Sequence, residues 1–163
     1  MPQLNLGLTR LSANDQHAIE AQHARLEQLL TDLCDTCSEF NHHADCSSCA
    51  REKVACCQGR LPSFLYDFLD LVAEHFETEE QIMDQLLQPS ETAYGEYLRH
   101  HREEHANLMR EVKKLIQQSS ELSKQGNVSE AIRLFHQLIS RRFSEHAHKF
   151  DNPLLKPELR VMN

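Results

Sequence analysis

The chain has 163 residues, only four of them glycine and five proline, and a formal net charge of −8 at pH 7. This length is enough for a single domain over residues 1–163 with a substantial core. The acidic charge argues against nucleic acid and anionic membrane surfaces as partners. Because no stretch resembles a signal peptide or approaches the roughly 20 apolar residues of a membrane helix, we expect a cytoplasmic protein.

Four long amphipathic helices are predicted along the chain. They cover residues 12–38, 62–87, 91–124 and 129–150. Ser12 is a good N-cap for the first helix, and Pro62 suits the first turn of the second. Pro89 ends the second helix, and "QGN" at 125–127 is typical of a helix C-cap and turn. The pattern predicts an all-α fold, an antiparallel four-helix bundle that runs up-down-up-down.

A cysteine-rich segment, residues 34–60, is predicted as an insertion between the first two helices. It holds all six cysteines of the chain, Cys34, Cys37, Cys46, Cys49, Cys56 and Cys57. Two CxxC pairs are typical of structural zinc, with His42 and His43 as further candidate ligands. Reactive thiols or disulfides are a second interpretation, and plain packing is a third.

Each predicted helix also carries histidine on or beside its apolar face. The candidate ligands are His23 in the first helix, His75 and Glu79 in the second, His101 and His105 in the third, and His146, His148 and Asp151 in the fourth. One such residue alone is more often a hydrogen-bonded core residue, but four helices with matching groups indicate a metal site inside the bundle. Imidazoles with carboxylates suit iron, manganese or zinc, and more than four ligands indicate two ions.

The stretches "EAQHARL", "HFETEEQIM", "HHREEH" and "HAHKFD" together resemble hemerythrin, and most closely a bacterial hemerythrin domain, over residues 12–155. The resemblance implies a non-haem di-iron site that binds or senses O₂. It implies that His101, His105 and His146 hold one iron, that His23 and His75 hold the other, and that Glu79 and Asp151 bridge them. With one bridging solvent, the two-histidine iron keeps an open position for O₂ or a small anion.

Helix geometry alone leaves the fourth helix ambiguous. His148 and Asp151 are three residues apart and share a face, whereas His146 and Asp151 are five apart, about 140° round an α-helix. The spacing in the family favours His146. In the third helix only His101 has a histidine four residues on, so His100 is expected outside the site.

The resemblance also implies a pocket of bulky apolar residues around the open iron. The matching positions are Leu26, Phe76, Arg142, Phe143, Ala147 and Phe150. Arg142 replaces the family's usual tryptophan and Ala147 its usual branched aliphatic, so both are expected to open or wet the pocket. The alternative is that Leu108 or Met109 fills the gap.

Two classes of function follow from this interpretation. The first is an oxygen- or redox-sensing module that binds O₂, with a covalently linked output domain such as a diguanylate cyclase. The second is a di-iron oxidase or peroxide-consuming enzyme, and an O₂ carrier is a further alternative. No acid or base beyond the ligands is evident near the site, which favours binding over catalysis, so we do not expect this chain to be an enzyme.

Overall fold

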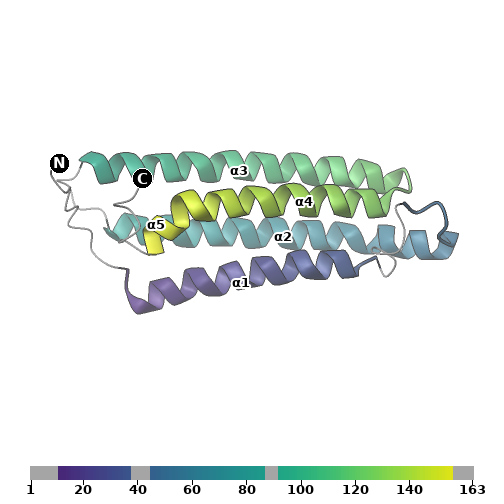
Figure 1. Cartoon of the computed structure of the whole chain (residues 1–163), viewed down its shortest axis with the longest axis horizontal. Helices are drawn as coiled ribbons and strands as arrows, with labels where there is room; N and C mark the ends of the chain where they lie inside the picture. Colours follow the sequence, from purple (N-terminus) through teal and green to yellow (C-terminus); the bar gives the residue numbers. More distant parts are fainter. Residues whose placement is uncertain (1–10, 38–44, 87–91, 156–163) are drawn as a thin grey trace.

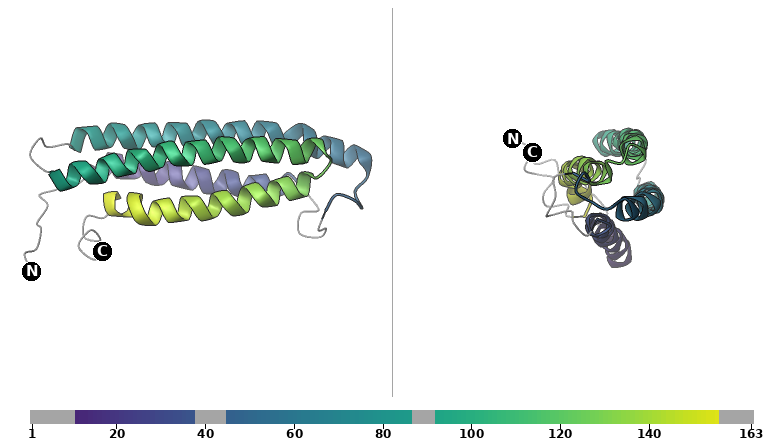
Figure 2. Two further views of the ribbon diagram at one scale, coloured as in Figure 1. Left: turned by 90° about the horizontal axis from the view of Figure 1, so that it is seen from above. Right: turned by 90° about the vertical axis from the view of Figure 1, so that its right-hand side faces the viewer.

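The computed structural model describes residues 11–37, 45–86 and 92–155, and every regular element within these ranges is helical. The long helices are α1 (Ala13–Asp35), α2 (Arg51–Leu86), α3 (Thr92–Lys124) and α4 (Val128–His146). A π-helical turn, η1 (Ala147–Asp151), and one last turn, α5 (Asn152–Leu155), follow α4 directly. The four long helices lie side by side and alternate in direction (Figures 1 and 2), which confirms the predicted four-helix bundle.

Two of the predicted helix ends are formed by the expected capping residues. The Ser12 hydroxyl accepts a hydrogen bond from the backbone N–H of Asp15 at 3.1 Å and caps α1. Gly126, with φ of 88°, follows α3 in the left-handed region that glycine adopts at low cost. The backbone N–H of Asn127 then reaches the carbonyl of Leu122 at 3.0 Å, which closes a Schellman motif.

The second helix begins earlier than predicted. α2 starts at Arg51, so Pro62 lies inside the helix rather than in its first turn. A proline there removes one backbone hydrogen bond, but its neighbour Leu61 and the next-turn Leu65 are each only 1% exposed. Burial of these side chains offsets the loss, since fully burying a leucine contributes about 1.5–3 kcal/mol.

The predicted cysteine-rich insertion is therefore largely helical at its two ends. Cys34 lies in α1, and Cys56 and Cys57 lie in α2. Cys46 and Cys49 belong to the short turn before α2. His42 and His43, named as candidate ligands, fall outside the described residues.

Two apolar clusters fill the bundle and leave a layer between them. The larger cluster occupies the half near the α3–α4 turn, and includes Leu30, Phe68, Val112 and Phe135. The smaller cluster comprises Ile19, Ile82, Met83, Leu98 and Leu154. In α1 and α3 the predicted ligands fall between residues of the two clusters, and in α2 Glu79 lies between Phe76 of the larger cluster and Ile82 of the smaller. Within the described ranges, no helix is both long and apolar enough to cross a membrane.

Candidate metal centre

The seven side chains that the resemblance implies as ligands all meet in this layer. They come from α1 (His23), α2 (His75, Glu79), α3 (His101, His105), α4 (His146) and η1 (Asp151). Six of them are at most 2% exposed. The side chain of His23 is 26% exposed, so the layer is most open to solvent beside α1.

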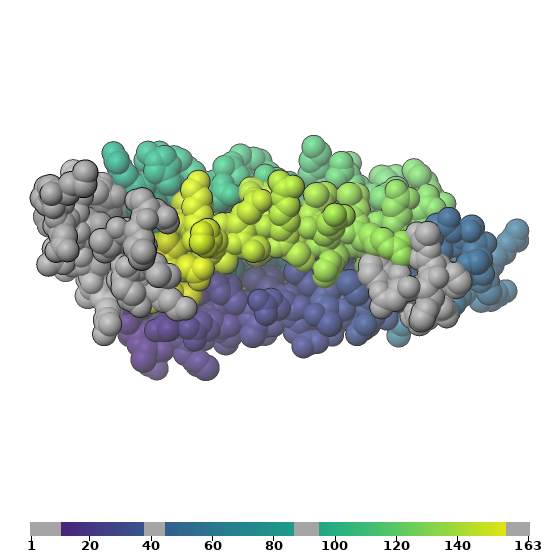
Figure 3. All heavy atoms as spheres, in the orientation of Figure 1, coloured from purple at the N-terminus to yellow at the C-terminus, as the bar shows by residue number. Residues whose placement is uncertain are grey.

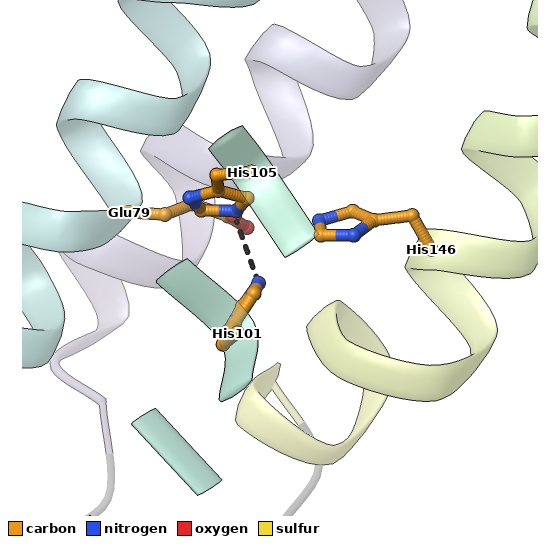
Figure 4. Close-up of side chains that lie close together, drawn as sticks. All are labelled: Glu79, His101, His105 and His146. Carbon is orange, nitrogen blue, oxygen red and sulfur yellow. Dashed lines mark hydrogen bonds and ion pairs between the residues drawn. The ribbon is translucent and has the colours of Figure 1, made fainter. Parts of the chain in front are cut away.

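The first group of ligand atoms belongs to Glu79, His101, His105 and His146, and these atoms all lie within 4.8 Å of one another. Figure 4 shows the three imidazoles and the carboxylate converging from three helices. The Oε2 atom of Glu79 lies 3.1 Å from Nε2 of His105 and 3.5 Å from Nε2 of His101. The group has the size and donor set of a site for one transition-metal ion.

The second group belongs to His23, His75, Glu79 and Asp151, again within 4.8 Å of one another. The Oδ2 atom of Asp151 lies 3.1 Å from Nε2 of His23, and the Oε1 atom of Glu79 lies 3.9 Å from Nε2 of His75. This group has one histidine fewer than the first.

Glu79 belongs to both groups, and Asp151 of the second group also reaches two histidines of the first. Glu79 turns Oε2 toward His101 and His105, and Oε1 toward His75. Asp151 turns Oδ2 toward His23, while its Oδ1 lies 3.0 Å from Nε2 of His146 and 3.3 Å from that of His101. Each carboxylate therefore offers one oxygen to each group, which is the arrangement that would bridge two cations.

Many of these atoms are buried without a hydrogen-bond partner. They are Nε2 of His23 and His75, both ring nitrogens of His101 and His146, Oε1 of Glu79 and Oδ1 of Asp151. Several lie at ion-pair distance from one another, but their directions do not form hydrogen bonds. An unsatisfied buried polar atom costs about 1–3 kcal/mol. A cation at the centre of each group would satisfy the carboxylate oxygens and one nitrogen of each imidazole. The residues present therefore fit metal ions.

Burial and neighbouring charges shift the pKa values of the side chains in this layer. Burial, opposed by Glu79, lowers the pKa of His75 to about 4, so its ring is neutral and able to bind a metal. Burial also lowers the pKa of His101, but Asp151 and Glu79 outweigh it and raise that pKa to about 9. Burial raises the pKa of both carboxyls, yet the imidazoles outweigh it and leave both below their usual values. Incoming cations would thus replace protons on the histidines.

Two further residues orient the histidines from outside the groups. Nδ1 of His75 lies 3.2 Å from Oε1 of the buried Gln22, whose amide donates to Oγ1 of Thr78 at 3.0 Å. Nδ1 of His105 lies 2.9 Å from a carboxylate oxygen of Glu80. Such partners keep the proton on Nδ1 and turn Nε2 toward the metal. Neither residue was predicted, although Gln22 is a polar residue on the apolar stripe between Ile19 and Leu26.

The π-turn resolves the ambiguity in the fourth helix. In η1 the backbone N–H of Asn152 bonds the carbonyl of Ala147, five residues back, instead of four as in an α-helix. This wider turn brings His146 and Asp151 to the same side, while His148 is exposed. The phenol of Tyr97 donates to the carbonyl of Phe150 at 2.5 Å and supports the turn.

The neighbouring His100 is also outside the layer, as expected. Its side chain is 59% exposed and lies 3.4 Å from a carboxylate oxygen of Glu103.

A cavity of about 460 Å³ lies between α1 and α4 and adjoins the second group. These helices are neighbours on the face of the bundle shown in Figure 3. The apolar residues that line the cavity are Leu26, Leu30, Phe68, Phe143 and Ala147. His23 and Asp151 form the part of its wall that belongs to the metal centre. Leu26, Phe143 and Ala147 therefore lie where the pocket was predicted, and neither Leu108 nor Met109 lines the cavity.

The other three predicted pocket residues do not line this cavity. The ring of Phe76 stacks on His105 with centroids 4.0 Å apart, and that of Phe150 stacks on His101 at 5.0 Å. Both therefore pack against the three-histidine group. Arg142, one residue before Phe143 and so about 100° round the helix, faces α3 instead.

The expectation that Arg142 wets the pocket is therefore wrong. Its guanidinium lies 2.7 Å from Glu111, 3.0 Å from Glu104 and 2.9 Å from Glu145. These three carboxylates hold it on the surface between α3 and α4. Of the two residues expected to open the pocket, only Ala147 lines the cavity.

The six cysteines are free thiols. Cys46 Sγ lies 3.4 Å from the backbone nitrogen of Ser129, and Cys57 Sγ lies 3.5 Å from the carbonyl of Thr36. Burial raises the pKa of Cys34 and Cys57, which argues against reactive thiolates. Within the described ranges, the thiols form no group of three at the spacing seen among the histidines. Of the three interpretations, these contacts support packing, and zinc binding stays a prediction.

The comparison with protein families agrees with the geometry. The family model described as the hemerythrin HHE cation binding domain matches residues 14–156, a range that includes all seven side chains of the metal centre. Searches among curated proteins and among solved structures found no match.

Proposed function

Because the chain belongs to the hemerythrin HHE cation-binding family, we propose that its metal centre holds two iron ions and binds O₂. His101, His105 and His146 would hold one iron, and His23 and His75 the other. Glu79 and Asp151 would bridge the pair, since each presents one oxygen to each group. Two ferrous ions would supply the electrons for O₂ binding. The shared carboxylates are the observation that carries the proposal.

The cavity supports the assignment of the open position. With one bridging solvent, the iron held by three histidines would have six ligands and the iron held by two would have five. Because the cavity adjoins His23 and Asp151 of the group with fewer ligands, we infer that the position without a protein ligand would lie on the side that a small molecule can reach. Its leucine and phenylalanine walls offer apolar contacts to O₂.

The same cavity favours sensing over storage. A carrier must keep water from the open iron, whereas here His23 is 26% exposed and Ala147 leaves space beside it. Water and protons at this position favour oxidation to the ferric state. A centre that O₂ readily oxidises suits an oxygen or redox sensor that passes its state to a covalently linked output domain.

One observation favours the enzyme alternative. Glu27 and His148 line the cavity and are exposed, so two titratable groups beyond the ligands lie beside the site, contrary to expectation. They are placed to exchange protons with solvent, which O₂ reduction by a di-iron oxidase needs. Sustained O₂ consumption with a reductant, over many turnovers per site, would favour this alternative.

Metal analysis tests the core of the proposal. Purified protein supplied with iron should hold two irons per chain, and His101→Ala or His105→Ala should remove most of it. His100→Ala is the matched control, because His100 neighbours His101 but is exposed. A single zinc that iron does not displace would overturn the proposal.

The rate at which O₂ oxidises the reduced protein tests the sensing role. Reduced protein mixed with O₂ should pass quickly to the ferric state, and Ala147→Ile should slow this step because it narrows the cavity. Wild-type protein that stays oxygenated for hours would instead support a carrier.

A further inference from the structure

The cavity beside the two-histidine group is much larger than O₂ requires. It measures about 460 Å³, whereas a water molecule, similar in size to O₂, occupies about 30 Å³ in the liquid. Cavities of roughly 300–1,000 Å³ are typical of sites for organic ligands. Passage of a diatomic gas explains only a small part of this space.

The chemistry of the cavity differs between its walls and its inner end. Leu26, Leu30, Phe68 and Phe143 provide walls on which an apolar chain can pack. At the end formed by His23 and Asp151, a ferric ion with an open position would attract an anion, because a bound cation is the largest local charge in such a site. A molecule that matches both the apolar walls and the positively charged end is an anion with an apolar tail.

We propose that the cavity binds small monocarboxylic acids, with the carboxylate at the open iron position and the tail along the α1–α4 walls. This inference rests on the proposed two-iron centre. Such acids would occupy, in the ferric state, the position that O₂ takes in the ferrous state. They would therefore stabilise the oxidised form and couple the redox state of the centre to the supply of these acids.

The charged groups around the cavity are compatible with this orientation. Glu27 and His148 are both exposed and line the cavity with Ser140 and Ser144. The Glu27 carboxylate lies in high dielectric, where its repulsion of a second carboxylate is weak. The Asp151 carboxylate already lies against His23 at 3.1 Å, and bound iron would neutralise it further.

The test uses oxidised, iron-loaded protein and the charge-transfer bands of the ferric centre. Acetate, butyrate, hexanoate and octanoate are titrated separately, with azide as an anion that has no tail. Burial of each methylene should strengthen binding by about two- to fourfold, so hexanoate should bind roughly 16- to 250-fold tighter than acetate. Hexanol, which has the tail without the carboxylate, should compete with hexanoate only weakly.

Two variants with a filled cavity and one control locate the tail. Ala147→Leu and Ser144→Leu each add bulk to a wall of the cavity. In either variant, hexanoate should bind less than about fivefold more tightly than acetate. Ala73→Leu is the matched control, because Ala73 is exposed on α2 and lines a different groove. It should keep the wild-type ratio. Two variants are used so that misfolding of one does not decide the outcome.

Four results would each overturn the proposal. If azide shifts the bands but all acids bind equally, or if both filled variants keep the wild-type ratio, the tail does not occupy this cavity and the two-iron centre stands. If hexanol competes as well as hexanoate, the carboxylate is not the anchor. If neither azide nor any acid shifts the bands of protein with two irons, the open position itself is wrong.

Discussion

Gln22 provides a sharp test of how the two-histidine group is built. Its Oε1 lies 3.2 Å from Nδ1 of His75, and its amide donates to Thr78. Gln22→Leu keeps a side chain of similar size but removes the acceptor for the Nδ1 proton. Because His75 is fully buried, water cannot replace that acceptor without opening the core.

The expected magnitude follows from two independent estimates. A buried donor left without a partner costs about 1–3 kcal/mol. Loss of a partner that orients a metal-binding histidine weakens metal affinity by about 10- to 100-fold, or about 1.4–2.8 kcal/mol at 1.4 kcal/mol per tenfold. We therefore expect the iron of the two-histidine group to bind 10- to 100-fold more weakly. The three-histidine group should be unaffected, because Gln22 does not contact it.

The assay is stepwise removal of iron by a chelator, followed by iron analysis and by the azide-dependent band. Gln22→Leu should fall from two irons to one at a chelator concentration at which the wild type keeps both, and its azide response should be lost first. Gln22→Glu, which retains an acceptor, should recover most of the affinity. Gln81→Leu is the control, because Gln81 is exposed on α2 and its amide donates to Glu77 one turn earlier, away from the histidines. Equal loss of both irons, or no loss, would refute the role given to Gln22.

Three further predictions concern the core, the π-turn and pH. Phe68→Ala should lower the free energy of unfolding by about 3–5 kcal/mol in urea denaturation, because Phe68 is 2% exposed and packs edge-to-face on Phe135. Tyr97→Phe should lower the melting temperature and weaken iron binding, since the carbonyl of Phe150 loses a donor worth about 0.5–1.5 kcal/mol. Iron affinity should rise with pH up to about 9, measured as proton release on Fe²⁺ binding, because His101 must lose its proton. In metal-free protein that proton stabilises the fold fully below about pH 6.5, and its contribution is lost as the pH rises through about 9.

The sequence by itself determined the fold class and the residues that meet in the layer. Helical periodicity depends only on the positions of apolar side chains, so it can be read from the sequence. Residues such as His75 and Glu79, or His101 and His105, are four apart, so an α-helix alone places each pair on one face. The family resemblance, which the comparison confirms, indicated that these pairs on different helices form one metal site.

Only the tertiary structure decided the features that depend on neighbouring helices. The choice between His146 and His148 rested on a π-turn, which local spacing does not reveal. Arg142 faces α3 because two carboxylates of that helix, Glu104 and Glu111, attract it there. α2 begins at Arg51 because burial of Leu61 outweighs the proline after it. The roles of Gln22 and of the cavity are likewise properties of packing between helices, and packing is set by where helices meet rather than by the order of residues along any one of them.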